Sequence, residues 1–363
     1  MHKKLLIFCF FIFFALWGGA QDVQNKSNDT VKKFRLTGLP VLFYLPETGL
    51  GYGGLGIATF RFKNEPEQSR ASSTQLAVSY TTKNQLLIFA PFELYWKQER
   101  WRLVGELGYF KYFYNFYGLG IDSNQADFET YEVTFPRLRV SLLKEVWPKI
   151  SVGLGYELDI YHDFVSKENG ILERTDIPGK RGGTVSNLGL LVFYDTRDDI
   201  FQPTRGFFVQ AAAFSAMDFL GASFSYAKFS LDSRFYQKIK GQHIIATNLF
   251  LANNGQGAPL YDLNRLGTNR TRGFNDRRYQ DNGELSFSME YRFPLSGRFG
   301  GTFFASTGTV APNFSALFSS RYRNTAGAGL RYTINKKEGI RLRVDYGQSA
   351  EGGNLYLTVR EAF

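Results

Sequence analysis

The stretch Glu284-Leu-Ser-Phe-Ser-Met-Glu-Tyr-Arg-Phe293 is the clearest indication of the fold, because its side chains alternate strictly between two kinds. The odd-numbered positions are large and hydrophobic, and the even-numbered positions are polar or charged. The two sets are Leu285, Phe287, Met289, Tyr291, Phe293 and Glu284, Ser286, Ser288, Glu290, Arg292. A period of two indicates a strand with a different environment on each face. In a soluble sheet the hydrophobic face would cover a core, whereas in a membrane barrel it faces lipid and the charged face lines a wet lumen.

Similar segments recur along the chain from Leu39 to Phe363. About sixteen of them read as strands, connected by short and long segments in turn. The expected bounds are 39–45, 50–62, 74–83, 85–96, 100–113, 129–143, 150–163, 184–195, 206–217, 223–237, 242–253, 284–294, 299–311, 323–335, 339–348 and 354–363. If both termini lie on one side, the long polar connections 114–128, 164–183 and 254–283 all lie on the other. The pattern therefore predicts an antiparallel, all-β barrel.

The first residues indicate export. Lys3 and Lys4 form a basic start, an apolar run follows, and Gly18-Gly19-Ala20 offers small residues for cleavage. We interpret residues 1–20 as a secretory signal peptide, residues 21–37 as a flexible periplasmic leader, and residues 38–363 as the barrel. The single cysteine, Cys9, lies in the signal peptide, so we expect no disulfide and no thiolate metal site in the mature chain.

Composition narrows the class of protein. Aromatic residues make up 17% of the chain, with 36 Phe and 21 Tyr. They could fill the core of a large soluble β protein, or they could form the lipid face and interfacial girdles of a barrel. The signal peptide and the scarcity of helical patterns favour the barrel. The formal net charge is +10, but the arginines fall at alternate strand positions and in one loop. We therefore expect a positive lumen or a surface facing anionic lipid headgroups, and no nucleic acid.

Residues suited to catalysis or cofactor binding are scarce. After the signal peptide the only histidines are His162 and His243. The run Gly51-Tyr-Gly-Gly-Leu-Gly56 matches a dinucleotide fingerprint, but a strand pattern follows it where the fingerprint needs a helix. We expect no enzymatic activity, no catalytic residues, no cofactor and no metal site.

Two motifs carry a resemblance to a known family. Arg272-Gly273-Phe274 lies in the long loop 254–283, and Tyr194-Asp-Thr-Arg-Asp-Asp-Ile-Phe-Gln-Pro-Thr-Arg-Gly206 lies between two expected strands. They resemble a loop motif and a periplasmic turn of the BamA/TamA-type outer-membrane assembly and secretion barrels, the bacterial surface antigen barrels. The resemblance covers roughly residues 38–363. It implies a transmembrane barrel of about sixteen strands in the outer membrane of a Gram-negative bacterium, with a long extracellular loop folded into the lumen.

The resemblance also implies a specific ion pair inside the barrel. The loop arginine of the family pairs with acids on the lumen wall, and Glu290 occupies the place of one of them. The second place is Ser306, which is expected to point inward without a charge, so Asp345 or Glu284 would have to substitute. We expect Arg272 to pair with Glu290, and in a wet lumen the pair should contribute about 1 kcal/mol of stabilisation. The alternative is an exposed loop whose arginines meet anionic lipid headgroups.

The end of the chain resembles the C-terminal assembly signal of outer-membrane barrels. Alternating hydrophobic residues lead to a terminal aromatic residue; the positions are Leu355, Leu357, Val359 and Phe363. We expect Phe363 at the membrane interface, where the final strand closes the sheet.

The function implied by the resemblance is assistance in protein assembly or translocation at the outer membrane. Expected partners are outer-membrane lipid and lipopolysaccharide, and unfolded outer-membrane or secreted proteins. Family members with these roles usually carry periplasmic POTRA docking domains before the barrel, and a leader of residues 21–37 is too short for one. A separate periplasmic partner would then have to supply docking. The competing class is a channel-forming or structural barrel without a protein client.

Overall fold

The computed structural model describes residues 34–45, 49–66, 69–199, 202–335, 340–359 and 361–363. The expected signal peptide and most of the expected leader lie outside these ranges. Within the described residues, no helix is both long enough and apolar enough to cross a membrane.

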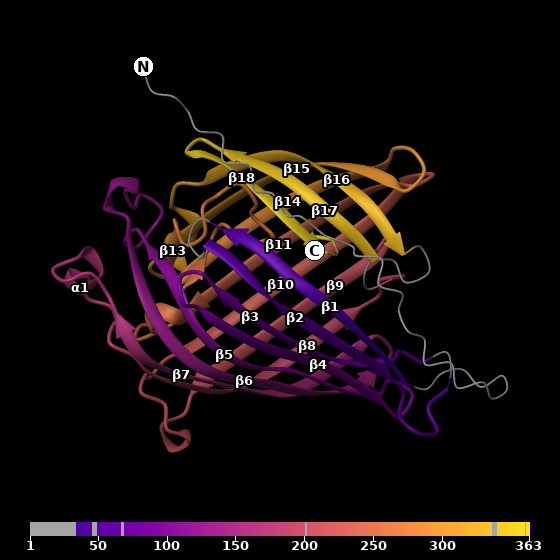
Figure 1. Cartoon of the computed structure of the whole chain (residues 1–363), viewed down its shortest axis with the longest axis horizontal. Coiled ribbons are helices and arrows are strands. Elements are labelled where there is room, and N and C mark those ends of the chain that lie inside the picture. Colours follow the sequence, from indigo (N-terminus) through magenta and orange to yellow (C-terminus); the bar gives the residue numbers. More distant parts are fainter. Residues whose placement is uncertain (1–33, 46–48, 67–68, 200–201, 336–339, 360) are drawn as a thin grey trace.

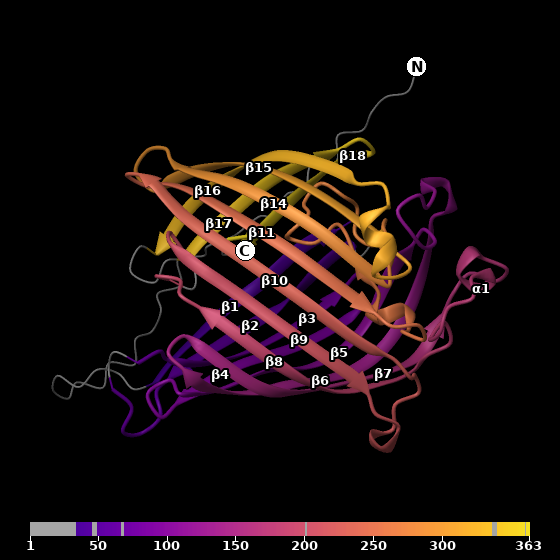
Figure 2. The same cartoon turned by 180° about the vertical axis from the view of Figure 1, so that it is seen from behind.

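Sixteen strands form one antiparallel sheet, in which successive long strands pair with each other. The sheet is rolled into a barrel with tilted strands (Figures 1 and 2). The strands are β1 (Phe34–Leu45), β2 (Gly49–Phe60), β3 (Ser72–Thr81), β4 (Leu86–Trp96), β5 (Trp101–Phe116), β6 (Glu129–Trp147), β7 (Ile150–Val165), β8 (Gly183–Asp195), β9 (Gly206–Ala216), β10 (Ala227–Lys240), β11 (His243–Asn254), β14 (Gly283–Pro294), β15 (Phe299–Ala311), β16 (Arg323–Asn335), β17 (Ile340–Ser349) and β18 (Gly352–Val359). The predicted all-β antiparallel barrel of about sixteen strands is confirmed. Its first strand begins at Phe34, so the sheet includes the last four residues of the expected leader.

Short elements lie in the connections. They are η1 (Gln125–Asp127), α1 (Ile171–Arg174), η2 (Asp218–Leu220), η3 (Leu260–Asp262) and η4 (Ser315–Phe318). A two-stranded ribbon, β12 (Asn264–Arg265) with β13 (Gln280–Asp281), forms within the loop between β11 and β14. The sequence pattern did not predict this ribbon, because two residues are too few to show a period.

The alternation in β14 produces the two faces that the sequence predicts. Its even-numbered side chains from Glu284 to Arg292 are buried inside the barrel, whereas Phe287 and Met289 are each 42% exposed on the outer face. In a membrane this outer surface contacts lipid. The polar side chains of β14 are therefore available to meet whatever enters the lumen.

The two ends of the sheet are β1 and β18. Among the described residues, β1 pairs with β2 and β18 pairs with β17, and no backbone pairing joins β1 to β18. Unpaired strand edges carry free N–H and C=O groups, which are costly in lipid. Between these two edges, the described part of the barrel wall has no backbone hydrogen bonds.

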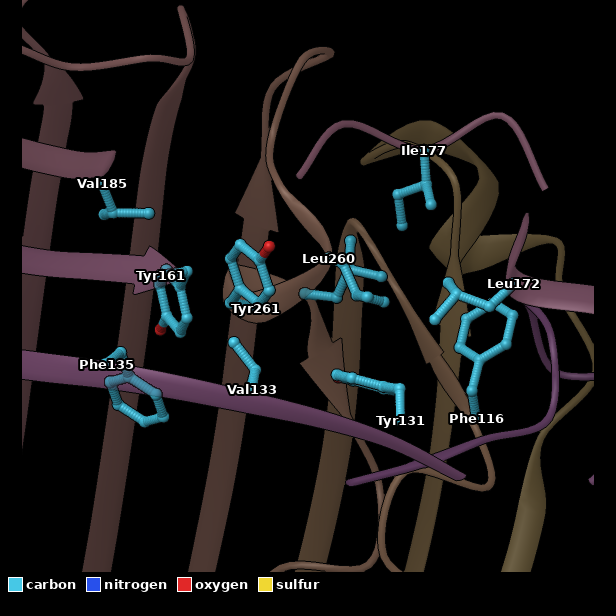
Figure 3. Close-up of a cluster of buried hydrophobic side chains, with 11 residues drawn as sticks. Phe116, Tyr131, Val133, Phe135, Tyr161, Leu172, Ile177, Val185, Leu260 and Tyr261 are labelled. Carbon is cyan, nitrogen blue, oxygen red and sulfur yellow. The ribbon is translucent and has the colours of Figure 1, made fainter. Parts of the chain in front are cut away.

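The half of the lumen beside the long connections contains a hydrophobic cluster (Figure 3). Side chains from the barrel wall pack there on the loops after β7 and β11; the buried members are Phe116, Tyr131, Val133, Phe135, Tyr161, Leu172, Ile177, Val185, Leu260, Tyr261 and Leu263. The rings of Tyr161 and Tyr261 stack with centroids 3.6 Å apart. The cluster anchors the loops after β7 and β11 to the barrel wall with packed apolar side chains.

An ion pair beside the cluster ties the same loop to the wall. The Asp262 carboxylate accepts hydrogen bonds from Tyr226 and Lys228, both at 2.6 Å. Burial raises the pKa of Asp262, but the positive charges of Lys228 and Arg139 together have the larger effect and lower the pKa to about 2. Asp262 therefore remains ionised at neutral pH and fixes the start of the β11–β14 loop.

The turn between β8 and β9 is organised by Asp198. Its carboxylate accepts hydrogen bonds from the backbone N–H groups of Thr204 and Arg205, at 2.8 and 3.1 Å, and from the Thr204 hydroxyl at 2.5 Å. Burial raises the pKa of Asp198, but these hydrogen bonds outweigh it, so the pKa lies below its usual 3.8. Backbone N–H groups that donate to a carboxylate favour its charged form, so the ionised Asp198 holds the turn.

We expect Asp198→Asn to loosen this turn at neutral pH and to matter less in acid. Because the folded pKa is lowered, the stabilisation is complete above the unfolded pKa and is lost as pH falls through the folded value. Amide hydrogen exchange at Thr204 should be several-fold faster in the variant at pH 7. The difference should shrink below about pH 4. A difference that is equal at both pH values would contradict the role of the ionised carboxylate.

Candidate functional site

The β11–β14 loop, residues 255–282, folds into the lumen and carries the Arg-Gly-Phe motif. At its base the Leu266 N–H donates to the Tyr279 carbonyl at 3.0 Å, next to the β12–β13 ribbon. Leu266, Phe274 and Tyr279 pack with Ile121 and Val310 in a buried hydrophobic cluster. The phenylalanine of the motif is therefore an apolar anchor for the loop.

Gly273 occupies a position that only glycine tolerates well. Its φ is +114°, a conformation that L side chains rarely adopt. Its N–H donates to the Tyr356 hydroxyl of β18 at 2.8 Å. The motif backbone also lies against Gly347 of β17, where an added Cβ would be 2.8 Å from Gly273 N and 2.9 Å from Arg272 C. Two glycines, one in the loop and one in the wall, thus allow this close approach.

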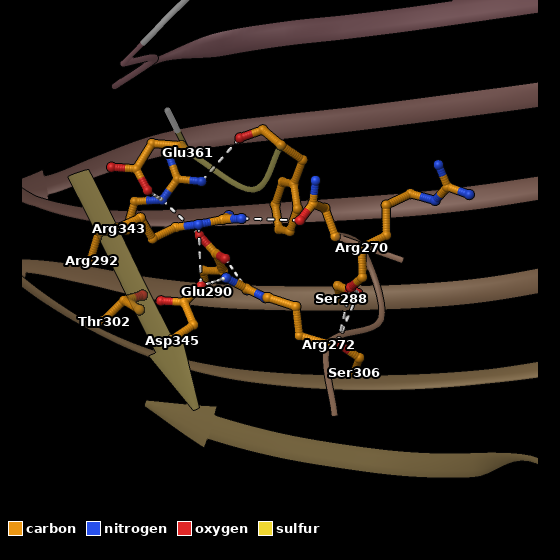
Figure 4. Close-up of polar contacts among 12 residues, drawn as sticks. Arg270, Arg272, Ser288, Glu290, Arg292, Thr302, Ser306, Arg343, Asp345 and Glu361 are labelled. Atoms are coloured by element: carbon orange, nitrogen blue, oxygen red, sulfur yellow. Dashed lines mark hydrogen bonds and ion pairs between the residues drawn. The ribbon is translucent and has the colours of Figure 1, made fainter. Parts of the chain in front are cut away.

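Arg272 lies fully buried inside the barrel, at 0% exposure (Figure 4). Its guanidinium donates through Nη2 to Glu290 of β14 and through Nη1 to Asp345 of β17. It also lies over the ring of Phe304 of β15, 3.8 Å from the centroid. The structure therefore places Arg272 with Glu290, and it supplies Asp345 as the second acid.

Ser306 points inward but contacts the loop backbone instead of the guanidinium. Its hydroxyl donates to the Arg270 carbonyl at 3.2 Å and pairs with the Ser288 hydroxyl at 3.0 Å. The Thr271 hydroxyl accepts a hydrogen bond from the Gly267 N–H at 2.9 Å and closes the turn before Arg272. Ser306 and Thr271 thus hold the loop through polar contacts to its backbone.

The pair belongs to a larger set of charges, which we call the lumen ion network. It consists of Arg272, Glu290, Arg292, Arg331, Arg341, Arg343, Asp345 and Glu361. Arg292 donates to Glu290 at 2.8 Å, and Arg331 pairs with Asp345 and with Glu361. Arg343 donates to Asn269 of the loop at 3.1 Å. The network joins the loop to β14, β16, β17 and the end of the chain.

Burial changes the energetics expected from the sequence. In a wet lumen the Arg272–Glu290 pair would contribute about 1 kcal/mol of stabilisation. In an exposed loop its contribution would be smaller. Arg272, Glu290 and Asp345 are each 0% exposed, so the alternative of an exposed Arg272 at lipid headgroups is wrong. Buried charge pairs are costly to break, at about 3–5 kcal/mol for the loss of one partner.

Phe363 does not lie at the membrane interface, so that expectation is wrong. It is 6% exposed and packs inside the barrel against Tyr236 and Ala246. The chain leaves the sheet after Val359, where β18 ends, and the alternation that suggested an interfacial position stops there. Leu355 faces outward at 49% exposure, whereas the side chains of Leu357 and Val359 lie outside what the structure describes.

Several site residues gave little or no signal in the sequence. Glu361 is an acid near the chain end, and nothing in its neighbourhood indicated burial. Gly329 of β16 reads as a small strand residue, yet an added Cβ there would overlap the Asp345 carboxylate. Asp345 was one of two candidates for the second acid, and the other, Glu284, pairs with Arg270 at 3.6 Å.

Comparisons with known proteins agree with this fold. The chain resembles BamA of Haemophilus ducreyi lacking POTRA domains 1–3, with a TM-score of 0.56 and 16% identity over 90% of this chain and 69% of that one. It also resembles CdiB of Escherichia coli, with a TM-score of 0.59 and 12% identity over 92% of this chain, and CdiB of Acinetobacter baumannii, with 0.55 and 13% over 91%. The chain spans 62% and 60% of the length of these CdiB chains. A search of curated proteins finds no match.

Structural likeness at this low sequence identity shows the fold alone, whereas a match to a family model shows the family. The model described as the Omp85 superfamily domain matches residues 68–352, which include β3 to β17 and the whole in-folded loop. This match covers most of the chain and bears out the resemblance drawn from the loop motif. The protein therefore belongs to the Omp85 superfamily.

Proposed function

We propose that the protein assists the assembly or translocation of other proteins at the outer membrane of a Gram-negative bacterium, without enzymatic chemistry. The observation that carries this proposal is the in-folded loop with Arg272 buried between Glu290 and Asp345. A solute channel needs a continuous wet path, but the loop and the hydrophobic cluster occupy this lumen with side chains such as Leu260, Leu266 and Tyr279, each 0% exposed. A client would then be handled at the barrel wall.

The edges of β1 and β18 suit such a role. An extended chain can add to an exposed strand edge through backbone hydrogen bonds, which place few demands on its sequence. In lipid these hydrogen bonds are worth more, because a free edge group has no water to bind. The expected clients are therefore unfolded outer-membrane or secreted chains, and a separate periplasmic subunit would deliver them. Outer-membrane lipid and lipopolysaccharide would surround the outer face.

Photo-crosslinking in intact cells tests the proposal. A photoreactive residue replaces Leu36 on β1 or Leu355 on β18, which face outward at 70% and 49% exposure. The matched control is Leu190 on β8, which faces outward at 59% exposure and lies far from both edges. We expect adducts with unfolded barrel precursors or a secreted chain at positions 36 and 355, and none at position 190.

The opposite result would favour the competing class. Equal adducts at all three positions, or lipid adducts only, would contradict client handling at the edges. Steady solute conductance of the purified protein in planar bilayers, together with the absence of client adducts, would indicate a channel-forming barrel.

A further inference from the structure

The last residues of the chain, 361–363, lie inside the barrel and are called here the tail. The side chain of Glu361 is 3% exposed and pairs with Arg331 at 3.0 Å, Arg341 at 3.4 Å and Arg292 at 3.9 Å. A backbone carboxylate oxygen of Phe363 accepts a hydrogen bond from Arg292 at 3.0 Å. The tail thus enters the lumen from the end opposite to the 255–282 loop, and the two segments approach each other at mid-barrel.

The loop and the tail share the same charged groups. Arg292 contacts Glu361 of the tail and also Glu290, which pairs with Arg272 of the loop. Arg331 contacts Glu361 and also Asp345, the second acid of Arg272. Each of the two acids that bind the loop is therefore one arginine away from the tail.

The charge balance gives this connection a direction. Among the described residues, the side chains of the lumen ion network provide five guanidinium groups and three carboxylates, so their formal charge is +2 with Glu361 in place and +3 without it. The backbone carboxylate of Phe363, which Arg292 also contacts, adds one more negative charge to the tail. Charges that share a buried site interact strongly, because little water screens them. Without Glu361, three other arginines, Arg292, Arg331 and Arg343, still contact the two acids of Arg272, and the repulsion on Arg272 increases.

We propose that the tail is a displaceable lock on the 255–282 loop. With the tail inserted, Glu361 compensates the excess positive charge and the loop remains docked. With the tail withdrawn, Arg292 and Arg331 are left with Glu290 and Asp345 alone, and the docked state of Arg272 is weakened. The proposal concerns positions of segments within this chain, and it holds or fails independently of any client.

The surroundings of the tail allow it to move. The tail residues belong to no strand, so they are bound by side chains and one backbone carboxylate contact. A cavity of about 250 Å³ lies beside them, and its lining includes the tail, the arginines Arg70, Arg102, Arg197 and Arg234, and the acids Glu93 and Asp195. A segment with a carboxylate and an aromatic ring two residues apart can therefore enter or leave without disturbing the sheet.

Thiol labelling of the loop tests this coupling. The reporter is Thr271→Cys, which is close in size to threonine, 0% exposed and next to Arg272. It is placed in the full chain with Cys9→Ser, so that it is the only thiol. Each variant is refolded from denaturant into detergent, which avoids any dependence on assembly in cells, and heat-modifiable migration verifies the barrel. The measured quantity is the rate of reaction with a bulky maleimide.

We expect Glu361→Gln, or a chain ending at Val359, to increase the labelling rate by about 5- to 150-fold, the usual range of coupling between two sites. A synthetic peptide with the sequence of residues 354–363, added to the truncated chain, should slow the labelling again. The same peptide with both Glu361→Gln and Phe363→Ala should not. The matched control is Glu106→Gln, which removes a wall carboxylate that pairs with Arg137 outside the network.

Three results would overturn the proposal. One is a labelling rate that Glu361→Gln and truncation leave unchanged in a folded barrel. Another is an equal increase with Glu106→Gln, which would indicate general loosening. The third is a peptide that slows labelling equally well with and without its carboxylate and ring.

Discussion

Arg272→Ala will release the 255–282 loop from the lumen and leave the sixteen-stranded sheet folded. The guanidinium makes two buried charge-assisted contacts, to Glu290 and Asp345, and lies on the ring of Phe304. Each charge-assisted bond is worth about 1.5–3 kcal/mol, so the docked loop should lose about 3 kcal/mol or more. That corresponds to roughly a hundredfold greater loop exposure. The rate at which trypsin cleaves the folded protein at the loop arginines measures this exposure.

The sheet should tolerate this change because the two acids keep other partners. Glu290 still binds Arg292, and Asp345 still binds Arg331. Heat-modifiable migration should therefore be retained. Arg265→Ala is the matched control, since Arg265 lies in the same loop but pairs with Asp276 near the surface, where ion pairs contribute little. A double-mutant cycle of Arg272→Ala with Glu290→Gln isolates the coupling, and a value within error of zero would contradict the buried pair.

Gly347→Ala should dislodge the same motif from the opposite side. The new Cβ would lie 2.8 Å from Gly273 N, 2.9 Å from Arg272 C and 3.0 Å from Arg272 O. These are backbone atoms, which cannot rotate away as the end of a flexible side chain can. Overpacking of this kind typically costs about 1–3 kcal/mol, so loop cleavage should rise by roughly 5- to 150-fold.

Gly54→Ala is the matched control for this substitution. Gly54 also lies within a strand, β2, but an added Cβ there meets nothing within 4 Å. The combined variant Gly347→Ala with Arg272→Ala should be no more cleavable than Arg272→Ala alone, because both changes undock one segment. Equal cleavage of Gly347→Ala and Gly54→Ala would show that the motif does not need this close approach.

Local patterns in the sequence were sufficient to predict the architecture of the wall. Alternation is a local property, because neighbouring side chains of a strand must point to opposite faces. The pattern in Glu284–Phe293 therefore predicted which side chains of β14 face the lumen, and all its even-numbered residues are buried. The long connections matched their expected positions for the same reason. The Arg-Gly-Phe motif indicated the in-folded loop, and the family match covers it.

Which charges meet inside the barrel could be seen only in the folded chain. Asp345 is the second acid because β17 lies only three strands from β14 in the sheet, so that Arg272 reaches both, and because Gly329 leaves room for its carboxylate. The buried state of Arg272 depends on packing by Phe304 and the loop, which no local pattern encodes. The tail was misplaced because its alternation ends at Val359 and its later course depends on Arg292, Arg331 and Tyr236. Periodicity reports the face of a strand, whereas a charge network depends on distances between strands far apart in the chain.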